Sequence, residues 1–368
     1  MACSCKITGV KVKVVEVPLH KQWQISLYSA KTRKHVVVEL STSSGVVGYG
    51  EASPSPAFMG EGADSVACVL ERYLVPVVLG VEVFDLEELH SKMDAAIAGN
   101  EAAKSALDMA AYDAAGKALG EPAYRLIGGK TNNGKVPLSW VVGIQEDEGA
   151  VEEAQRYASM GFPTIKLKVG KDPERDVRLV RSVARALGGG VRIRLDANQG
   201  YDVSTAVRVI TQLEETVELE CVEQPVPRWD IEGLRTIRNK VRTPVMVDEA
   251  VFGPHDILRI AAAGACDVLN IKIGKVGGIW PAKKVAAIAE SAGIHCAVGS
   301  NLELSIGSAA GLHFAASTSI VTYPSDLLIG PWLHEHDIVE RSLADLIKDG
   351  FASVPEIPGL GVVCAVTF

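Results

Sequence analysis

Charged side chains recur at nearly constant intervals, each at the end of a short apolar run. Lys168 closes the run TIKLK, and Asp196, Glu223, Asp248 and Lys272 follow at successive intervals of 28, 27, 25 and 24 residues. The stretches between these runs, such as DPERDVRLVRSVARALG, have the apolar spacing of amphipathic helices. Each interval therefore predicts one strand and one helix of a parallel sheet that is covered by helices.

The repeated units define most of the predicted architecture. At least seven of them follow one another within residues 133–330, which favours a closed (β/α)7β barrel of the TIM type, an α/β fold, over an open sheet. Alternating runs in residues 7–50 predict a strand meander, and residues 64–130 predict helices. We therefore expect an α+β capping domain over residues 1–132, and a C-terminal segment, residues 331–368, that returns to it.

Composition excludes several classes of partner. The 368 residues are 48% hydrophobic and carry a formal charge of −8, which disfavours nucleic acid as the main ligand. No run approaches the length of uninterrupted apolar sequence that a membrane helix needs, and the N-terminus alternates like a strand rather than a signal peptide. The seven cysteines are mostly scattered through apolar runs, without zinc-ligand spacing, which is typical of reduced thiols. We expect a cytoplasmic protein.

Three carboxylates stand at the ends of consecutive predicted strands: Asp196 in RLDANQG, Glu223 in CVEQP and Asp248 in VMVDEA. In a barrel these ends are neighbours and face one mouth. Three acidic oxygens beside room for water and substrate suit Mg²⁺. Any one of them alone would read equally well as a residue that caps the following helix.

Two lysines share one strand face, because Lys166 and Lys168 are two residues apart. If that face lines the barrel, both ammonium groups approach the carboxylates. Their mutual repulsion and partial burial would then lower a lysine pKa towards the range of a base. The alternative is a solvated strand face. Lys272, four strands later, is expected across the barrel from the pair.

These motifs together resemble the enolase superfamily and, within it, the muconate lactonizing enzyme subgroup. The resemblance also includes GYGEASPSPAFMGE and KSALDMAAYDAAGKALGEPAYRLIGG in the first domain. It implies Mg²⁺, with Mn²⁺ as a substitute, on the three carboxylates and bound to the carboxylate of a small substrate. Lys168 and Lys272 would then be acid/base catalysts on opposite faces, with Lys166 adjusting the electrostatics. The resemblance also implies a homo-oligomer, between a dimer and an octamer.

Substrate choice is expected to rest on the capping loops and the last strand ends. The candidate substrate-binding residues are Tyr28, Phe58, Asn198, Glu303 and Asp326, with Trp23 and Met59 as further residues that could close over a ligand. Packing between domains is the alternative for the aromatic residues. Dipeptide epimerases of the subgroup carry Asp-x-Asp near the last strand, whereas this chain has only Asp326, which reads equally well as a turn residue.

The barrel chemistry fits more than one reaction. Removal of a proton next to a carboxylate, with lysines on both faces, permits cycloisomerisation, racemisation or dehydration. The leading prediction is a cycloisomerase of the muconate type. The alternatives are a racemase or epimerase of an amino-acid derivative or dipeptide, and then a dehydratase of an acid sugar or hydroxy acid. A binding protein without catalysis would lack a metal ligand or a lysine, and this chain retains all of them.

Overall fold

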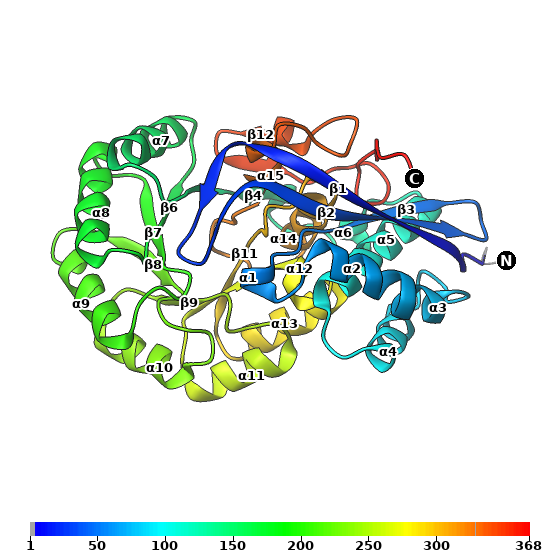
Figure 1. Cartoon of the computed structure of the whole chain (residues 1–368), viewed down its shortest axis with the longest axis horizontal. Helices are drawn as coiled ribbons and strands as arrows, with labels where there is room; N and C mark the ends of the chain where they lie inside the picture. The colour runs from blue at the N-terminus through cyan, green and yellow to red at the C-terminus, as the bar shows by residue number, and fades with distance from the viewer. Residues whose placement is uncertain (1–3, 328) are drawn as a thin grey trace.

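The computed structural model describes residues 4–327 and 329–368. A barrel whose strands are surrounded by helices lies beside a smaller domain of strands and helices (Figure 1). A long strand pair of the small domain, coloured blue, runs across to the barrel. The predicted α/β barrel with an α+β capping domain is thus confirmed.

The capping domain is built around an antiparallel sheet with the order β1-β2-β3. Its strands are β1 (Ile7–Gln24), β2 (Ser29–Thr42) and β3 (Val47–Ala52). Its helical segments are α1 (Pro56–Met59), α2 (Ala63–Val69), the π-helical turn η1 (Leu70–Leu74), α3 (Val75–Val78), α4 (Leu86–Ala96), α5 (Glu101–Leu119) and α6 (Ala123–Ile127).

Seven parallel strands form the barrel wall in chain order. They are β5 (Ser139–Val142), β6 (Thr164–Lys168), β7 (Arg192–Asp196), β8 (Leu219–Glu223), β9 (Val245–Val247), β10 (Val268–Ile271) and β11 (His295–Val298). The helices between and after them are α7 (Asp147–Ser159), α8 (Pro173–Leu187), α9 (Val203–Glu214), α10 (Ile231–Lys240), α11 (Pro254–Ala263), α12 (Ile273–Val276), α13 (Ile279–Ser291) and α14 (Ser305–Ala316). The apolar runs of the sequence became these strands because both of their faces are buried, one by helices and one inside the barrel.

An extended segment closes the barrel between its first and last strands. Val321 forms a parallel bridge with Cys296 of β11, and Ser325 forms one with Leu138, just before β5. The amide of Asp326 donates to the carbonyl of Val298 over 2.8 Å. This segment occupies the position of the eighth strand, as the (β/α)7β prediction requires.

The C-terminal part contacts both domains. It contains α15 (Ile329–Leu333), the 3₁₀ turn η3 (Leu343–Leu346), β12 (Ile347–Lys348) and β13 (Phe351–Ser353). Strand β13 pairs with β4 (Lys135–Pro137), which follows the short 3₁₀ turn η2 (Asn132–Gly134). Further on, the amide of Leu360 donates to Asp113 of α5 over 2.8 Å, and Gly359 accepts from the amide of Ala123 over 2.7 Å.

Helix α5 lies at the centre of the molecule, which explains its alanine-rich sequence. Every residue from 102 to 116 is buried, so no polar face remains and small side chains allow close packing. Gly48 and Gly50 of β3 meet it backbone to backbone. A Cβ at Gly50 would lie 1.8 Å from the carbonyl oxygen of Ala106, so a larger residue there would push the sheet away from the helix.

No helix in residues 4–327 and 329–368 is long and apolar enough to cross a membrane. This agrees with the sequence, in which no such run is found.

Candidate active site

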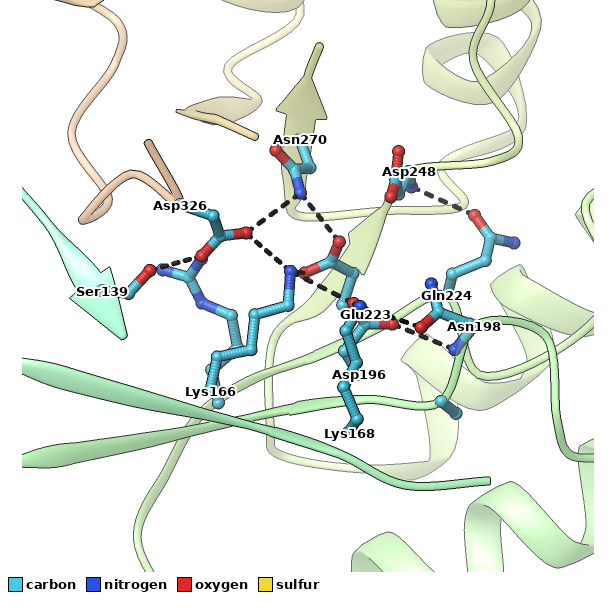
Figure 2. A network of polar contacts seen from close by, with 12 residues as sticks. Ser139, Lys166, Lys168, Asp196, Asn198, Glu223, Gln224, Asp248, Asn270 and Asp326 are labelled. Atoms are coloured by element: carbon cyan, nitrogen blue, oxygen red, sulfur yellow. Dashed lines mark hydrogen bonds and ion pairs between the residues drawn. The ribbon is translucent and has the colours of Figure 1, made fainter. Parts of the chain in front are cut away.

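The predicted lysines and carboxylates come together at the C-terminal ends of neighbouring barrel strands, and Figure 2 shows all of them except Lys272. Lys168 of β6 is paired with Asp196 of β7, which is paired with Glu223 of β8. Asp248 directly follows β9, and Lys272 directly follows β10. Parallel strands of a barrel end at the same rim, so residues that are far apart in the sequence converge there.

Lys166 lies among three carboxylates in the barrel interior. Its ammonium nitrogen is 2.6 Å from a carboxylate oxygen of Asp326 and 2.7 Å from one of Glu223. A third oxygen, from Asp196, is 3.1 Å away. These contacts explain why Lys166 can be buried beside Lys168 on one strand, because several negative charges surround its positive charge.

Lys168 and Lys272 stand on opposite sides of the carboxylate group. The Nζ of Lys168 is 2.5 Å from Asp196 Oδ2 and 2.8 Å from Asn198 Oδ1. The Nζ of Lys272 is 2.7 Å from Asp248 Oδ2 and 4.2 Å from the ring centroid of Phe58. Both lysines are more than nine-tenths buried. The site thus presents two amines from strands that are four positions apart.

The expected lowering of a lysine pKa is wrong for Lys166. Burial favours the neutral amine, but the carboxylates of Asp326, Glu223 and Asp196 outweigh burial and raise its pKa. Burial also opposes the charge of Lys272, but its pKa is raised because the charges of Asp248 and Glu249 and the hydrogen bond to Asp248 together outweigh burial. The expectation was wrong because the attraction of the surrounding carboxylates for an ammonium group raises the pKa more than burial and the repulsion between lysines lower it.

The carboxylates divide into charged and proton-holding groups. Burial opposes the charge of Asp248, but Lys272 and Lys275 outweigh burial and lower its pKa. Burial, reinforced by the charge of Asp196, raises the pKa of Glu223 to about 7. Burial and the charge of Asp248 raise the pKa of Glu249 to about 8. The site therefore has more carboxylates than its lysines can fully stabilise.

The same carboxylates fit a divalent cation by their chemistry. Within the described residues, no group of three or more acidic, histidine or cysteine side chains is arranged to hold an ion as it stands. The ammonium of Lys166 lies between Asp196 and Glu223 instead. However, Glu249 Oε2 has neither a hydrogen bond nor an ion pair among the described residues, and Glu223 Oε2 and Asp248 Oδ2 meet only the ammonium groups of Lys166 and Lys272, at 2.7 Å each. Hard oxygen donors of this kind are the ligands that Mg²⁺ prefers.

Asn198 connects a lysine to a carboxylate. Its Oδ1 accepts from Lys168, and its Nδ2 donates to Glu249 Oε1 over 3.0 Å. The hydroxyl of Ser26, from the capping hairpin, donates to the carbonyls of Ala197 and Asn198 over 2.8 Å each. The capping domain is thereby tied directly to the barrel loop that carries this asparagine.

Asp326 lies inside the barrel, with each of its oxygens in contact with protein donors. Oδ2 accepts from Lys166 and lies 3.5 Å from Asn270 Nδ2, while Oδ1 accepts from the hydroxyl of Ser139 and from Arg194 over 3.3 Å. Figure 2 shows it directed towards Lys166. This placement makes Asp326 a counter-charge for Lys166 and Arg194.

The remaining candidates lie around the rim. Phe58 covers Lys272, whereas Tyr28 lies beside Arg33 in the capping domain, 5.9 Å from its guanidinium carbon to the ring centroid. Glu303 Oε2 accepts from the hydroxyl of Ser300 over 2.5 Å and from the amide of Asn301 over 2.7 Å. Trp23 and Tyr28 pack in an apolar cluster with Leu19, Ile25, Ala30, Val141, Leu302, Ile329 and Leu333.

Several polar residues of the site were missed from the sequence. Lys275 donates to Asp248 Oδ1 over 2.8 Å, Asn270 donates to Glu223 over 2.8 Å, and Arg194 is fully buried beside Glu220. Lys275 was visible in NIKIGKVGG, three residues after Lys272 and therefore on the same side of a helical turn. Arg194 was visible in RIRLD, in phase with Asp196 on the strand.

A buried chain of three side chains connects the capping domain to the loop that carries Glu303. Glu51 accepts from the amides of Leu304 and Gly307 over 2.8 Å each and meets His35 Nδ1 at 2.9 Å. His35 Nε2 is 3.2 Å from His334 Nε2, and His334 Nδ1 lies 2.8 Å from the carbonyl of Gly330.

The side chains of Glu51, His35 and His334 share one proton. Because the Gly330 carbonyl can only accept, His334 donates from Nδ1 and, when neutral, accepts at Nε2. His35 must then donate from Nε2, which leaves its Nδ1 as an acceptor unless it is protonated. Burial raises the pKa of Glu51 to about 8 and lowers that of His35 to about 3. The proton therefore lies on Glu51, next to a neutral His35.

Two family models cover most of the chain. The model of the mandelate racemase / muconate lactonizing enzyme N-terminal domain matches residues 7–128, and that of the enolase C-terminal domain-like fold matches residues 149–365. The chain belongs to the mandelate racemase / muconate lactonizing enzyme family of the enolase superfamily, and it is an isomerase of that superfamily.

Individual relatives catalyse different reactions. The chain is 35% identical to an L-Ala-D/L-Glu epimerase of Clostridium acetobutylicum, over 97% of this chain and 98% of the relative. It is 34% identical to muconate cycloisomerase 1 of Rhodococcus opacus, over 97% and 95% of the two chains. It superimposes with a TM-score of 0.92 on a dipeptide epimerase of Enterococcus faecalis solved with Mg and the dipeptide L-Leu-L-Tyr, which is 33% identical, over 98% of this chain and 100% of that one.

Proposed function

We propose that this protein is a Mg²⁺-dependent racemase or epimerase that inverts the carbon next to a carboxylate in an amino-acid derivative or dipeptide. The relatives favour this reaction over the cycloisomerisation that led the sequence-based predictions, because epimerases are among those that match over almost the whole chain. The cation would be held by Asp196, Glu223 and Asp248, as the sequence predicted.

The placement of Lys168 and Lys272 carries the proposal. Each amine contacts a carboxylate oxygen, of Asp196 and of Asp248 respectively, and the two stand on either side of the carboxylate group. A substrate carbon between them would face one amine on each side. One lysine can then remove a proton from one face while the other returns a proton to the opposite face.

The two proton transfers balance without any other reagent. The neutral amine of one lysine takes the α-proton, and the electron pair of the broken C–H bond moves into the substrate carboxylate. The ammonium of the other lysine then donates a proton to the α-carbon from the opposite side, which inverts the centre. Bound Mg²⁺ would stabilise the negative charge that develops on the substrate carboxylate and would weaken the pull of the carboxylates that raises the pKa of Lys272.

Other residues hold this arrangement in place. The ammonium of Lys166 places a positive charge in contact with the carboxylates of Asp196 and Glu223. Asn198 holds Lys168 in position through a 2.8 Å hydrogen bond. Phe58 covers Lys272 and limits access of water to it, which strengthens electrostatic interactions inside the site.

Cycloisomerisation of a muconate-type diacid is the second candidate. The 34% identity to muconate cycloisomerase 1, across 97% of this chain, supports it. The same lysines would serve, since either ammonium can protonate the carbon that becomes electron-rich when a carboxylate oxygen closes the lactone ring.

The test is proton NMR in D₂O with Mg²⁺ on a panel of N-acylamino acids, dipeptides and cis,cis-muconates. We expect the α-proton signal of an amino-acid derivative to disappear as deuterium enters, without a new carbon skeleton. Lys168→Ala and Lys272→Ala should both lose racemisation, whereas Lys171→Ala, an exposed neighbour, should retain it. Lactone signals would move the assignment to the cycloisomerase. Full activity in both catalytic variants would refute the two-lysine mechanism.

A further inference from the structure

The two carboxylate oxygens of each predicted cation ligand have different surroundings. One oxygen of Asp196, of Glu223 and of Asp248 accepts from a donor that is not one of the predicted lysines. Among the described residues, the other oxygen of each meets only the ammonium groups of lysines on β6 or directly after β10. The same division occurs at the ends of three neighbouring strands, so it decides which oxygens a cation could reach.

The donors to the first two ligands are held in place by the main chain or by burial. The amide of Asn198 donates to Asp196 Oδ1 over 3.0 Å. An amide of the main chain moves only with its loop, and Ser26 fixes that loop with two hydrogen bonds. The side chain of Asn270, on β10, donates to Glu223 Oε1 over 2.8 Å and is fully buried. One oxygen of each carboxylate is therefore occupied before any cation binds.

Lys275 holds the third ligand in the same way. Its ammonium donates to Asp248 Oδ1 over 2.8 Å and also to the backbone carbonyl of Asp248. The side chain comes from α12 and has no exposed surface, whereas Lys272 contacts the other oxygen, Oδ2, at 2.7 Å. Two hydrogen bonds to one residue leave Lys275 little freedom, and a buried ammonium repels a second cation from the oxygen that it contacts. Oδ1 of Asp248 is thus closed to a metal ion.

The oxygens that remain are Asp196 Oδ2, Glu223 Oε2 and Asp248 Oδ2. Each belongs to a different carboxylate, so a cation on them would receive one oxygen from each side chain. Mg²⁺ demands octahedral geometry, and single oxygens from these carboxylates leave positions for water and substrate. Ca²⁺ is larger, accepts about six to eight oxygens and often binds both oxygens of one carboxylate. The arrangement therefore suits the smaller ion.

We infer that Lys275 is a positioning residue that sets the choice of cation, because it confines Asp248 to a single metal-binding oxygen. Asn270 does the same for Glu223. The inference deepens the proposed function, on which it rests, by stating how the protein favours Mg²⁺ over Ca²⁺. Groups that hydrogen-bond to the ligands of a metal commonly change its affinity by about 10–100-fold, so the effect is large enough to measure.

A comparison of the two cations separates this role from a simple effect of charge. Loss of the Lys275 ammonium would strengthen the binding of Mg²⁺ and of Ca²⁺ alike, since both ions are divalent. The freed Oδ1 of Asp248 would help Ca²⁺ in addition, because Ca²⁺ readily binds a carboxylate through both oxygens. The ratio of the two dissociation constants therefore reports on the freed oxygen, and the effect of charge cancels from it.

The experiment measures the dissociation constants of Mg²⁺ and Ca²⁺, added as their chlorides, by calorimetry without substrate and at constant ionic strength. Lys275→Met and Asn270→Ala are compared with the parent protein and with Lys284→Met, which removes an exposed lysine of the neighbouring helix α13. Thermal unfolding checks that each variant is folded. Asn270→Ala frees an oxygen of Glu223 without changing any charge, so the test remains available if Lys275→Met does not fold.

We expect the ratio of the Kd for Ca²⁺ to the Kd for Mg²⁺ to fall roughly 10-fold in Lys275→Met and in Asn270→Ala, and to keep its parent value in Lys284→Met. A crystal structure of either variant with Ca²⁺ should show the freed carboxylate bound through both oxygens. An unchanged ratio in the folded variants would overturn the inference, since the two donors would then only stabilise the fold. A parent protein that binds neither cation would instead refute the proposed cation site itself.

Discussion

Asp326 provides the sharpest test of how the barrel interior is held together. Its two oxygens contact four donors, including the ammonium of Lys166 at 2.6 Å and the guanidinium of Arg194 at 3.3 Å. The substitution Asp326→Asn keeps the shape of the side chain and removes its charge. An amide N–H₂ group would also have to face either Lys166 or Arg194, and neither can accept a hydrogen bond.

The expected cost follows from the burial of all three groups. Lys166, Arg194 and Asp326 are each less than 4% exposed, so water cannot replace the lost charge. Removing one partner of a buried ion pair destabilises a protein by about 3–5 kcal/mol. With an unfolding entropy of about 2.1 cal/mol/K per residue, the melting temperature of a 368-residue chain should fall by about 4–6 °C.

The assay is urea denaturation and calorimetry of Asp326→Asn beside a matched control. The control is Asp345→Asn, which removes an exposed carboxylate 3.5 Å from Arg341 and should cost about 0.5 kcal/mol or less. If Asp326→Asn were as stable as the control but bound an amine-bearing ligand more weakly, Asp326 would be a substrate contact. The reasoning from its burial would then be refuted.

Three further changes test other parts of the structure. In the parent protein, the free energy of unfolding should fall by about 2 kcal/mol as pH rises from 6.5 towards 8. The substitution Glu51→Gln should flatten this fall. This is because Glu51, with a pKa raised from 4.5 to about 8, keeps in the folded state a proton that the unfolded chain releases. The measurement is unfolding with Mg²⁺ at each pH, and an unchanged slope in the variant would contradict the assignment of the proton. Gly50→Ala should cost about 1–3 kcal/mol, because its Cβ would lie 1.8 Å from the Ala106 carbonyl oxygen, whereas Gly9→Ala, with nothing within 4 Å, should be neutral. Chelation should abolish α-proton exchange and lower the melting temperature, and added Mg²⁺ should restore both; a melting temperature that is independent of Mg²⁺ would argue against a cation at the carboxylates.

Local patterns in the sequence were sufficient to predict the barrel and most of its reactive rim. Apolar runs flanked by helical spacing predict parallel strands, and a charged residue at the end of each run must lie at the common rim. Lys168, Asp196, Glu223, Asp248 and Lys272 are therefore found where the spacing put them. The alanine-rich sequence of α5 also predicted a helix that ends at a glycine, and the helix does end at Gly120, which has the left-handed conformation.

Only the tertiary structure decided which charges meet. Asp326 is 160 residues from Lys166, and no periodicity relates the closing segment of the barrel to β6. The raised pKa of Lys166 depends on that contact, so the sequence alone led to the wrong direction. Hydrophobic and helical patterns are local properties of the chain, whereas electrostatic balance is a sum over neighbours that folding brings together.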